Sequence, residues 1–374
     1  MTRASGVGSW PGTRSREAVV AVRDLLGDGI PHLPELPGRG VGADMVGRAA
    51  GLLEGLHVET QPYGWRFAGR PGHDEGRARA LLREDLDELA EAYDGWSGPL
   101  KVQVTGPWTL GATIELPRGE RAVADHGARR DLVGSLAEGL RAHIADVERL
   151  VPGAEVVVQV DEPALPAVLE GRLPTASGYG TLRSVERSEV RDGLREVLDA
   201  AGERTTLVHC CAGEVPVQLL RESGARGISL DTSLLDGARW EQVAEAVEAG
   251  VTLWAGAVPT SGGDWRTARD RLVGAWQRIG LPVTLLGDLV TDALNTAAGL
   301  ADGTSSGLGF ISVGAARSVV SATARKRWWS APRVRCAGWR TCETGPPRPA
   351  TAVATAAATS AAPTAAASAT PPKM

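Results

Sequence analysis

Short apolar runs alternate with amphipathic runs through most of the chain, and this alternation constrains the fold more than any other feature. The candidate strands cover residues 6–10, 32–36, 57–61, 100–104, 155–160, 205–210, 227–230 and 251–258. Apolar residues at helical spacing predict helices over 77–94, 129–150, 187–201 and 240–249. Near-continuous apolar strands separated by helices are typical of a parallel sheet. About eight such repeats in roughly 300 residues predict a closed (β/α)8 TIM barrel in the α/β class. A doubly wound open sheet is the alternative, although no Gly-x-Gly-x-x-Gly follows a strand.

The composition changes near residue 302, which divides the chain into two parts. Residues 1–302 carry the repeats and are expected to form the barrel, with an incomplete last element. Residues 303–374 begin Gly/Ser-rich, continue as a basic patch with two tryptophans at 325–329, and end in an Ala/Thr/Pro-rich stretch. We expect this second part to be an irregular, disordered tail. A basic, aromatic tail is also compatible with RNA or membrane binding, but a tail read in a shifted frame explains the loss of periodicity better.

Charge and hydropathy exclude several classes of function. The formal net charge is −5, and nine basic residues against one acid after residue 302 leave −13 on the first part. An acidic body argues against binding a nucleic-acid backbone. No run of roughly 18 apolar residues predicts a membrane span, and the first twelve residues lack the apolar core of a signal peptide. Four cysteines in 374 residues are no disulfide framework. We therefore expect a cytoplasmic protein with reduced thiols, and a monomer.

A His-Cys-Cys triplet at 209–211 follows the apolar run 205–208. Side chains alternate along a strand, so His209 and Cys211 should point the same way and Cys210 the opposite way. An imidazole and a thiolate side by side are half of a tetrahedral zinc site. The alternative is a histidine with ordinary partners beside two buried cysteines.

Carboxylates end two neighbouring strands. Asp161 and Glu162 close a valine-rich run, and in a barrel the catalytic residues lie at the carboxyl ends of the strands. At least one of the two should project into the mouth of the barrel, unless Asp161 caps a helix before Glu-Pro. Asp231 ends the strand after the His-Cys-Cys strand. It either caps a helix or reaches the same metal, since neighbouring strands lie about 5 Å apart.

Three further strand-end residues are weaker candidates. Ser9 lies in Gly-Ser-Trp-Pro, and Glu35 lies between two prolines; both are often turn or loop residues. Trp108 follows Gly-Pro at the end of the 100–104 run. It belongs either to the core or to a site where it stacks on a flat ligand.

Taken together, these motifs resemble the catalytic half of cobalamin-independent methionine synthase. They are Val-Gly-Ser-Trp-Pro at 7–11, Ala-Asp-Met-Val at 43–46, Val-Thr-Gly-Pro-Trp-Thr at 104–109, Gln-Val-Asp-Glu-Pro-Ala-Leu at 159–165, His-Cys-Cys at 209–211 and Ser-Leu-Asp-Thr-Ser at 229–233. The chain is most similar to the short, single-barrel actinobacterial members. The resemblance covers roughly residues 4–300 and rests chiefly on the 159–165 and 209–211 motifs, which are fairly specific.

The resemblance implies a zinc-dependent transfer of a methyl group, from a methylated folate or another donor, to the thiol of homocysteine. It implies zinc ligands at His209, Cys211 and Asp231. It implies substrate contacts at Ser9, Asp161 and Glu35, and places Trp108 near the folate. The chemistry is reasonable, because a thiol with a pKa near 8.5 is mostly protonated at neutral pH and zinc deprotonates it.

The sequence departs from the family in two places. The family has a further zinc-ligand cysteine just before Gly-Leu-Ala, but here alanines precede Gly299 to Ala301. No histidine occurs at 255–260, where the longer enzymes carry a catalytic one. Cys336 and Cys342 lie in the aberrant tail and are poor substitutes. One frame error explains both the missing cysteine and the tail, so another reading frame downstream of codons 285–300 should encode a Cys-Gly-Leu-Ala-like strand end and an amphipathic closing helix.

Other readings remain open at this point. A uroporphyrinogen decarboxylase-like barrel needs no zinc thiolate, so bound zinc discriminates against it. A corrinoid-linked barrel methyltransferase would take its methyl group from a different donor. A zinc-binding barrel left inactive by the missing cysteine would bind zinc without alkylating homocysteine.

Overall fold

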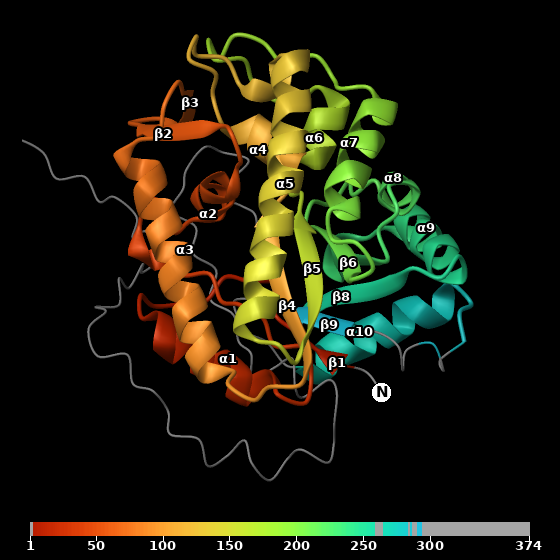
Figure 1. Cartoon of the computed structure of the whole chain (residues 1–374). Helices are drawn as coiled ribbons and strands as arrows, with labels where there is room; N and C mark the ends of the chain where they lie inside the picture. Colours follow the sequence, from red (N-terminus) through yellow and green to blue (C-terminus); the bar gives the residue numbers. More distant parts are fainter. Residues whose placement is uncertain (1–2, 259–264, 283–284, 286–289, 294–374) are drawn as a thin grey trace, which may run out of the picture. The chain divides into compact units, whose positions relative to one another are not determined.

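The computed structural model describes residues 3–258, 265–282, 285 and 290–293. Its centre is a parallel sheet of seven strands in the order β1-β9-β8-β7-β6-β5-β4 (Figure 1). The strands are β1 (Arg3–Ala4), β4 (Gly98–Thr105), β5 (Ala154–Asp161), β6 (Thr205–Cys210), β7 (Gly227–Asp231), β8 (Thr252–Val258) and β9 (Val290–Ala293). The predicted α/β class with a parallel sheet is confirmed.

Helices follow the strands, as the alternation predicted. They are α1 (Ser15–Leu26), α2 (Met45–Leu52), α3 (His73–Ala92), α4 (Pro107–Thr113), α5 (His126–Leu150), α6 (Leu165–Glu170), α7 (Arg187–Asp199), α8 (Val217–Glu222), α9 (Gly237–Glu248) and α10 (Trp265–Arg278). In α5, Asp125 caps the first turn by accepting from the Ala128 N–H at 2.8 Å. Its buried Leu132, Leu136 and Leu140 share one face, which packs into the main core.

Residues 57–61 do form a strand, β2 (His57–Gln61), but its place was predicted wrongly. It pairs antiparallel with β3 (Gly64–Ala68) in a separate hairpin and takes no part in the parallel sheet. Most side chains of both strands are only partly buried, and Gly64 turns the chain with φ +140°. A half-exposed ribbon needs no continuous apolar run, whereas a central barrel strand does. Strand β9 was not predicted from the sequence.

The segments 6–10 and 32–36 contribute bridges instead of regular strands. His32 pairs with Lys101 on β4, and Ser9 pairs with Glu35, both in the parallel sense. Backbone N–H groups of Leu33 and Glu35 donate to the carbonyls of Lys101 (2.9 Å) and Gly8 (3.0 Å). These bonds fix two predicted site residues, Ser9 and Glu35, next to each other.

Within the described residues no helix has the length and apolar character needed to cross a membrane. The predicted tail at 303–374, including Cys336 and Cys342, lies outside the described residues, as does the Gly299–Ala301 stretch.

Candidate functional site

Three neighbouring strands end at one level and place their last residues side by side. In the sheet register Thr105 on β4 is opposite Asp161 on β5, and Asp161 is opposite His209 on β6. His209 Nδ1 lies 2.8 Å from Asp161 Oδ1. Both side chains are buried, at 5% and 9% exposure. The carboxylate and the imidazole therefore form a hydrogen-bonded pair at the carboxyl ends of the strands.

The His209 ring also lies near the thiol of Cys211. Nε2 is buried and has no hydrogen-bond partner of ordinary geometry among the described residues. Burial opposes a charge on the ring, but Asp161 and the nearby Cys211 outweigh it and raise the pKa of His209 to about 10. Cys210 points the opposite way into the core, where burial raises the pKa of its thiol far above the usual range.

Glu162 binds the start of helix α4 and does not contact His209 through its carboxylate in the way that Asp161 does. Its carboxylate accepts hydrogen bonds from the Trp108 N–H (3.0 Å), the Thr109 N–H (2.8 Å) and the Thr109 hydroxyl (2.7 Å). These groups form the start of α4, so Glu162 satisfies the free N–H groups of that helix. Of the Asp-Glu pair, Asp161 is the one that reaches His209.

Asp231 lies on the neighbouring strand, but its carboxylate is engaged locally. Its Oδ1 accepts from the Ser233 N–H (2.9 Å) and the Ser233 hydroxyl (2.6 Å), as a cap of the short turn Thr232–Leu234. Across residues 3–258 and the later described segments, no three His, Cys, Asp or Glu side chains are grouped so as to hold a metal ion. His209 and Cys211 therefore lie near each other, whereas the Asp231 carboxylate is bonded to Ser233.

Glu35 is buried beside a cation. Its Oε1 lies 3.5 Å from Nε of Arg48, and the two side chains are 8% and 5% exposed. Burial raises the pKa of Glu35 to about 7, with Arg48 opposing and Asp161 adding to the shift. Gln103 also approaches the Glu35 carboxylate and donates to the Leu33 carbonyl at 2.6 Å. Ser9 pairs with Glu35 through the backbone bridge.

Trp108 does not offer its ring to a ligand, contrary to the sequence prediction. The side chain is 2% exposed, its Nε1 donates to the Val190 carbonyl at 3.1 Å, and the ring lies against Gly193 of α7. The tryptophan therefore joins α4 to α7 as part of the core.

Gln159 and Lys101 lie behind the Asp161–His209 pair and were missed by the sequence reasoning. Gln159 Nε2 is 2.7 Å from Asp161 Oδ1, and Lys101 Nζ is 2.6 Å from Gln159 Oε1. Both side chains are fully buried. The sequence does contain a signal for each residue. Gln159 is a polar residue two positions before Asp161 in a valine-rich strand, and so lies on the same face, while Lys101 is a lysine within an apolar strand.

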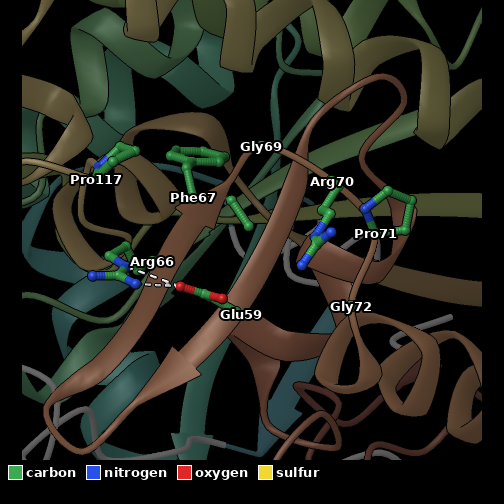
Figure 2. A pocket seen from close by; sticks show the side chains of 9 residues that line it. Glu59, Arg66, Phe67, Gly69, Arg70, Pro71, Gly72 and Pro117 are labelled. Atoms are coloured by element: carbon green, nitrogen blue, oxygen red, sulfur yellow. Dashed lines mark hydrogen bonds and ion pairs between the residues drawn. The ribbon is translucent and has the colours of Figure 1, made fainter.

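A separate hollow has none of these residues in its lining. A cavity of about 650 Å³ lies on the β2–β3 hairpin and is lined by Glu59, Arg66, Phe67, Arg70 and Pro117 among others (Figure 2). Arg66 is paired with Glu59 across the hairpin. None of the predicted site residues lines this cavity. A pocket of about 10 Å³ is lined in part by Glu35 and has room for at most about one water. The buried hydrogen-bonded cluster is therefore the better candidate site.

The fold and the cluster define a parallel α/β protein with a buried polar site at the carboxyl ends of its strands. No protein-family model matches the sequence, and no curated protein matches it. Among solved structures the fold is similar to that of "a B12-independent methionine synthase from Shewanella sp. W3-18-1 in complex with Selenomethionine". The TM-score is 0.53 at 14% identity, over 86% of this chain and 98% of that one. The predicted resemblance is thereby supported at the level of the fold.

Proposed function

We propose that the chain is a zinc-dependent methyltransferase that moves a methyl group from a methylated folate to the thiol of homocysteine, forming methionine. The observation that carries this proposal is the state of His209. Its Nδ1 is bonded to Asp161, its buried Nε2 has no hydrogen-bond partner among the described residues, and the ring lies near Cys211. The fold shared with a B12-independent methionine synthase supports it.

The donor atoms fit zinc. A zinc-ligating histidine usually gives its second ring nitrogen to a carboxylate, which fixes the ring and the tautomer. His209 Nε2 and Cys211 Sγ would hold the metal, with Asp231 as a third ligand if its carboxylate leaves Ser233. Bound zinc would supply the positive charge that keeps the homocysteine sulfur as a thiolate at neutral pH.

The other predicted residues are placed to bind an amino acid. Glu35 and Ser9 are neighbours, and Glu35 is close enough to Asp161 for that carboxylate to add to the raised pKa of Glu35. A substrate ammonium placed between such carboxylates would relieve this repulsion. Holding the amino-acid end at Ser9, Glu35 and Asp161 would then orient the sulfur toward His209 and Cys211.

We place this activity in a closed (β/α)8 barrel formed within residues 1–302, acting as a cytoplasmic monomer without nucleic acid or membrane. The bonds from β4 to residues 31–33, and from Glu35 to Gly8, support closure, because they link β4 toward the β1 end of the sheet. The tail 303–374 is proposed to take no part.

The test is methionine formation by the purified full-length chain. Homocysteine is supplied with 5-methyltetrahydrofolate, as the mono- and triglutamate, or with methylcobalamin, and methionine is detected by mass spectrometry. Cys211→Ala should abolish formation, while the matched Cys210→Ala, which changes the cysteine facing the core, should retain it. Equal activity in the two variants would contradict the proposal.

A second candidate is a zinc-binding barrel without transferase activity. It is favoured by the lack, among the described residues, of a third donor grouped with His209 and Cys211. Stoichiometric zinc together with no methionine from any of these donors would select this candidate.

A further inference from the structure

We propose that Lys101 and Gln159 are positioning residues. They hold Asp161 in an orientation in which its Oδ1 acts as an acceptor, and never as a donor, toward Nδ1 of His209. The four side chains form one line across three adjacent strands, β4, β5 and β6. The contacts are Lys101 Nζ to Gln159 Oε1 (2.6 Å), Gln159 Nε2 to Asp161 Oδ1 (2.7 Å) and His209 Nδ1 to Asp161 Oδ1 (2.8 Å). All four residues are buried.

The orientation of the Gln159 amide follows from its partners. A lysine ammonium only donates hydrogen bonds, so the amide atom facing Lys101 is the oxygen. The amide nitrogen then faces the Val7 carbonyl at 2.8 Å as well as Asp161. A flipped amide would set N–H groups against the ammonium and an oxygen against two acceptors. Lys101 also donates to the Val7 carbonyl at 3.0 Å, so the lysine and the Gln159 amide are both bonded to the same backbone oxygen.

The fixed amide in turn decides the role of Asp161. Because Gln159 Nε2 donates to Oδ1, that oxygen is an acceptor, and its second contact must come from a donor. His209 Nδ1 therefore carries a proton, and Nε2 is the ring nitrogen left for a ligand. The contacts that connect Lys101 to His209 run through Gln159 and Asp161.

The first test uses the metal-free full-length chain and does not depend on the proposed function. With 15N-labelled histidine, His209 should show an Nδ1–H proton in slow exchange, bonded to Asp161. In Lys101→Met and in Gln159→Met this resonance should be lost or broadened. Thr206→Val is the matched control, because Thr206 is a buried polar residue on β6 whose side chain points away from His209. An Nδ1–H signal unchanged in both variants would overturn the inference.

The second test measures zinc affinity by competition with a chelator, and for this readout the inference rests on the proposed function. Loss of an outer partner of a zinc-bound histidine typically costs about 10–100-fold in affinity. We expect that loss in Lys101→Met, in Gln159→Met and in Gln159→Glu, which keeps the bond to Lys101 but turns an acceptor toward Asp161. The double variant Lys101→Met/Gln159→Met should bind no more weakly than Gln159→Met alone.

These outcomes separate the two ideas. Additive losses in the double variant would mean that Lys101 acts through its charge alone, and would contradict positioning through the amide. A wild-type chain that binds no zinc would refute the proposed function, while the Nδ1–H resonance would still decide the positioning role. If Lys101→Met fails to fold, Gln159→Glu carries the test, because it changes the fewest atoms.

Discussion

Asp85 on α3 is the centre of a buried charge cluster whose loss should destabilise the protein severely. Its carboxylate is fully buried and accepts from the Ser15 hydroxyl (2.7 Å), from Arg39 Nη2 (2.6 Å) and from Arg48 Nη1. The two arginine side chains are 7% and 5% exposed. Arg48 continues to Glu35, so the cluster connects α1, α2 and α3 to the candidate site.

Asp85→Asn keeps the size of this side chain but removes its charge. Two buried guanidinium groups then lose their common anion, and breaking a buried ion pair in this way costs about 3–5 kcal/mol. Ser15→Ala removes one neutral donor to this carboxylate instead and should cost about 1.5–3 kcal/mol. Asp85→Asn should therefore lose more unfolding free energy than Ser15→Ala, and this ranking tests the reasoning as well as either value does.

The assay is urea unfolding followed by tryptophan fluorescence and circular dichroism. Asp85→Asn should lower the midpoint by at least about 1 M, given a slope of about 1–3 kcal/mol per molar. Glu91→Gln is the matched control on the same helix, because Glu91 pairs with Arg16 where both side chains are more than half exposed. Its midpoint should not move. An Asp85→Asn midpoint equal to that of wild type would refute the reasoning.

Three further predictions concern the thiols, the pH dependence and helix packing. Iodoacetamide should label Cys211 in the native protein and label Cys210 only after unfolding, since Cys210 is 0% exposed; equal labelling by peptide mass spectrometry would contradict the strand orientation. Because the folded protein raises the pKa of Glu35 from 4.5 to about 7, it binds that proton more tightly than the unfolded chain does. Stability should fall by about 3 kcal/mol as the pH rises through this interval. Glu35→Gln should flatten that part of a urea-unfolding pH series, and an unchanged slope would argue against the shift. Gly139→Ala should lower the free energy of unfolding by about 1–3 kcal/mol, since its Cβ would lie 1.8 Å from a carbonyl oxygen of α2. Gly76→Ala on α3, with nothing within 4 Å of the added atom, is its control, and equal stability of the two would refute the close contact.

The sheet could be predicted where strands are buried on both faces. Residues 205–210 were predicted as a strand and form β6 with the same bounds. A short apolar run rich in β-branched residues favours a strand that is buried on both faces. The run 57–61 is a strand too, but periodicity does not say which strand it pairs with. Pairing depends on β3 and its turn, which the sequence reasoning did not weigh.

The candidate site was predictable in its residue types more than in its contacts. Alternation placed His209 opposite to Cys210, but it did not say whether Asp161 or Glu162 would reach the imidazole. That depends on the register between β5 and β6, which sets Asp161 beside His209. The burial of Trp108 likewise depends on α7, whose Gly193 admits the ring.

The most direct test of the account is the zinc content of the purified full-length chain. We expect about one zinc per chain in the wild type, since the proposed site at His209 and Cys211 holds one ion, and we expect little zinc in His209→Ala measured beside it. Thr206→Val should keep the wild-type content. A wild-type protein without zinc, or a His209→Ala protein with the same content as wild type, would contradict a metal site at His209 and Cys211.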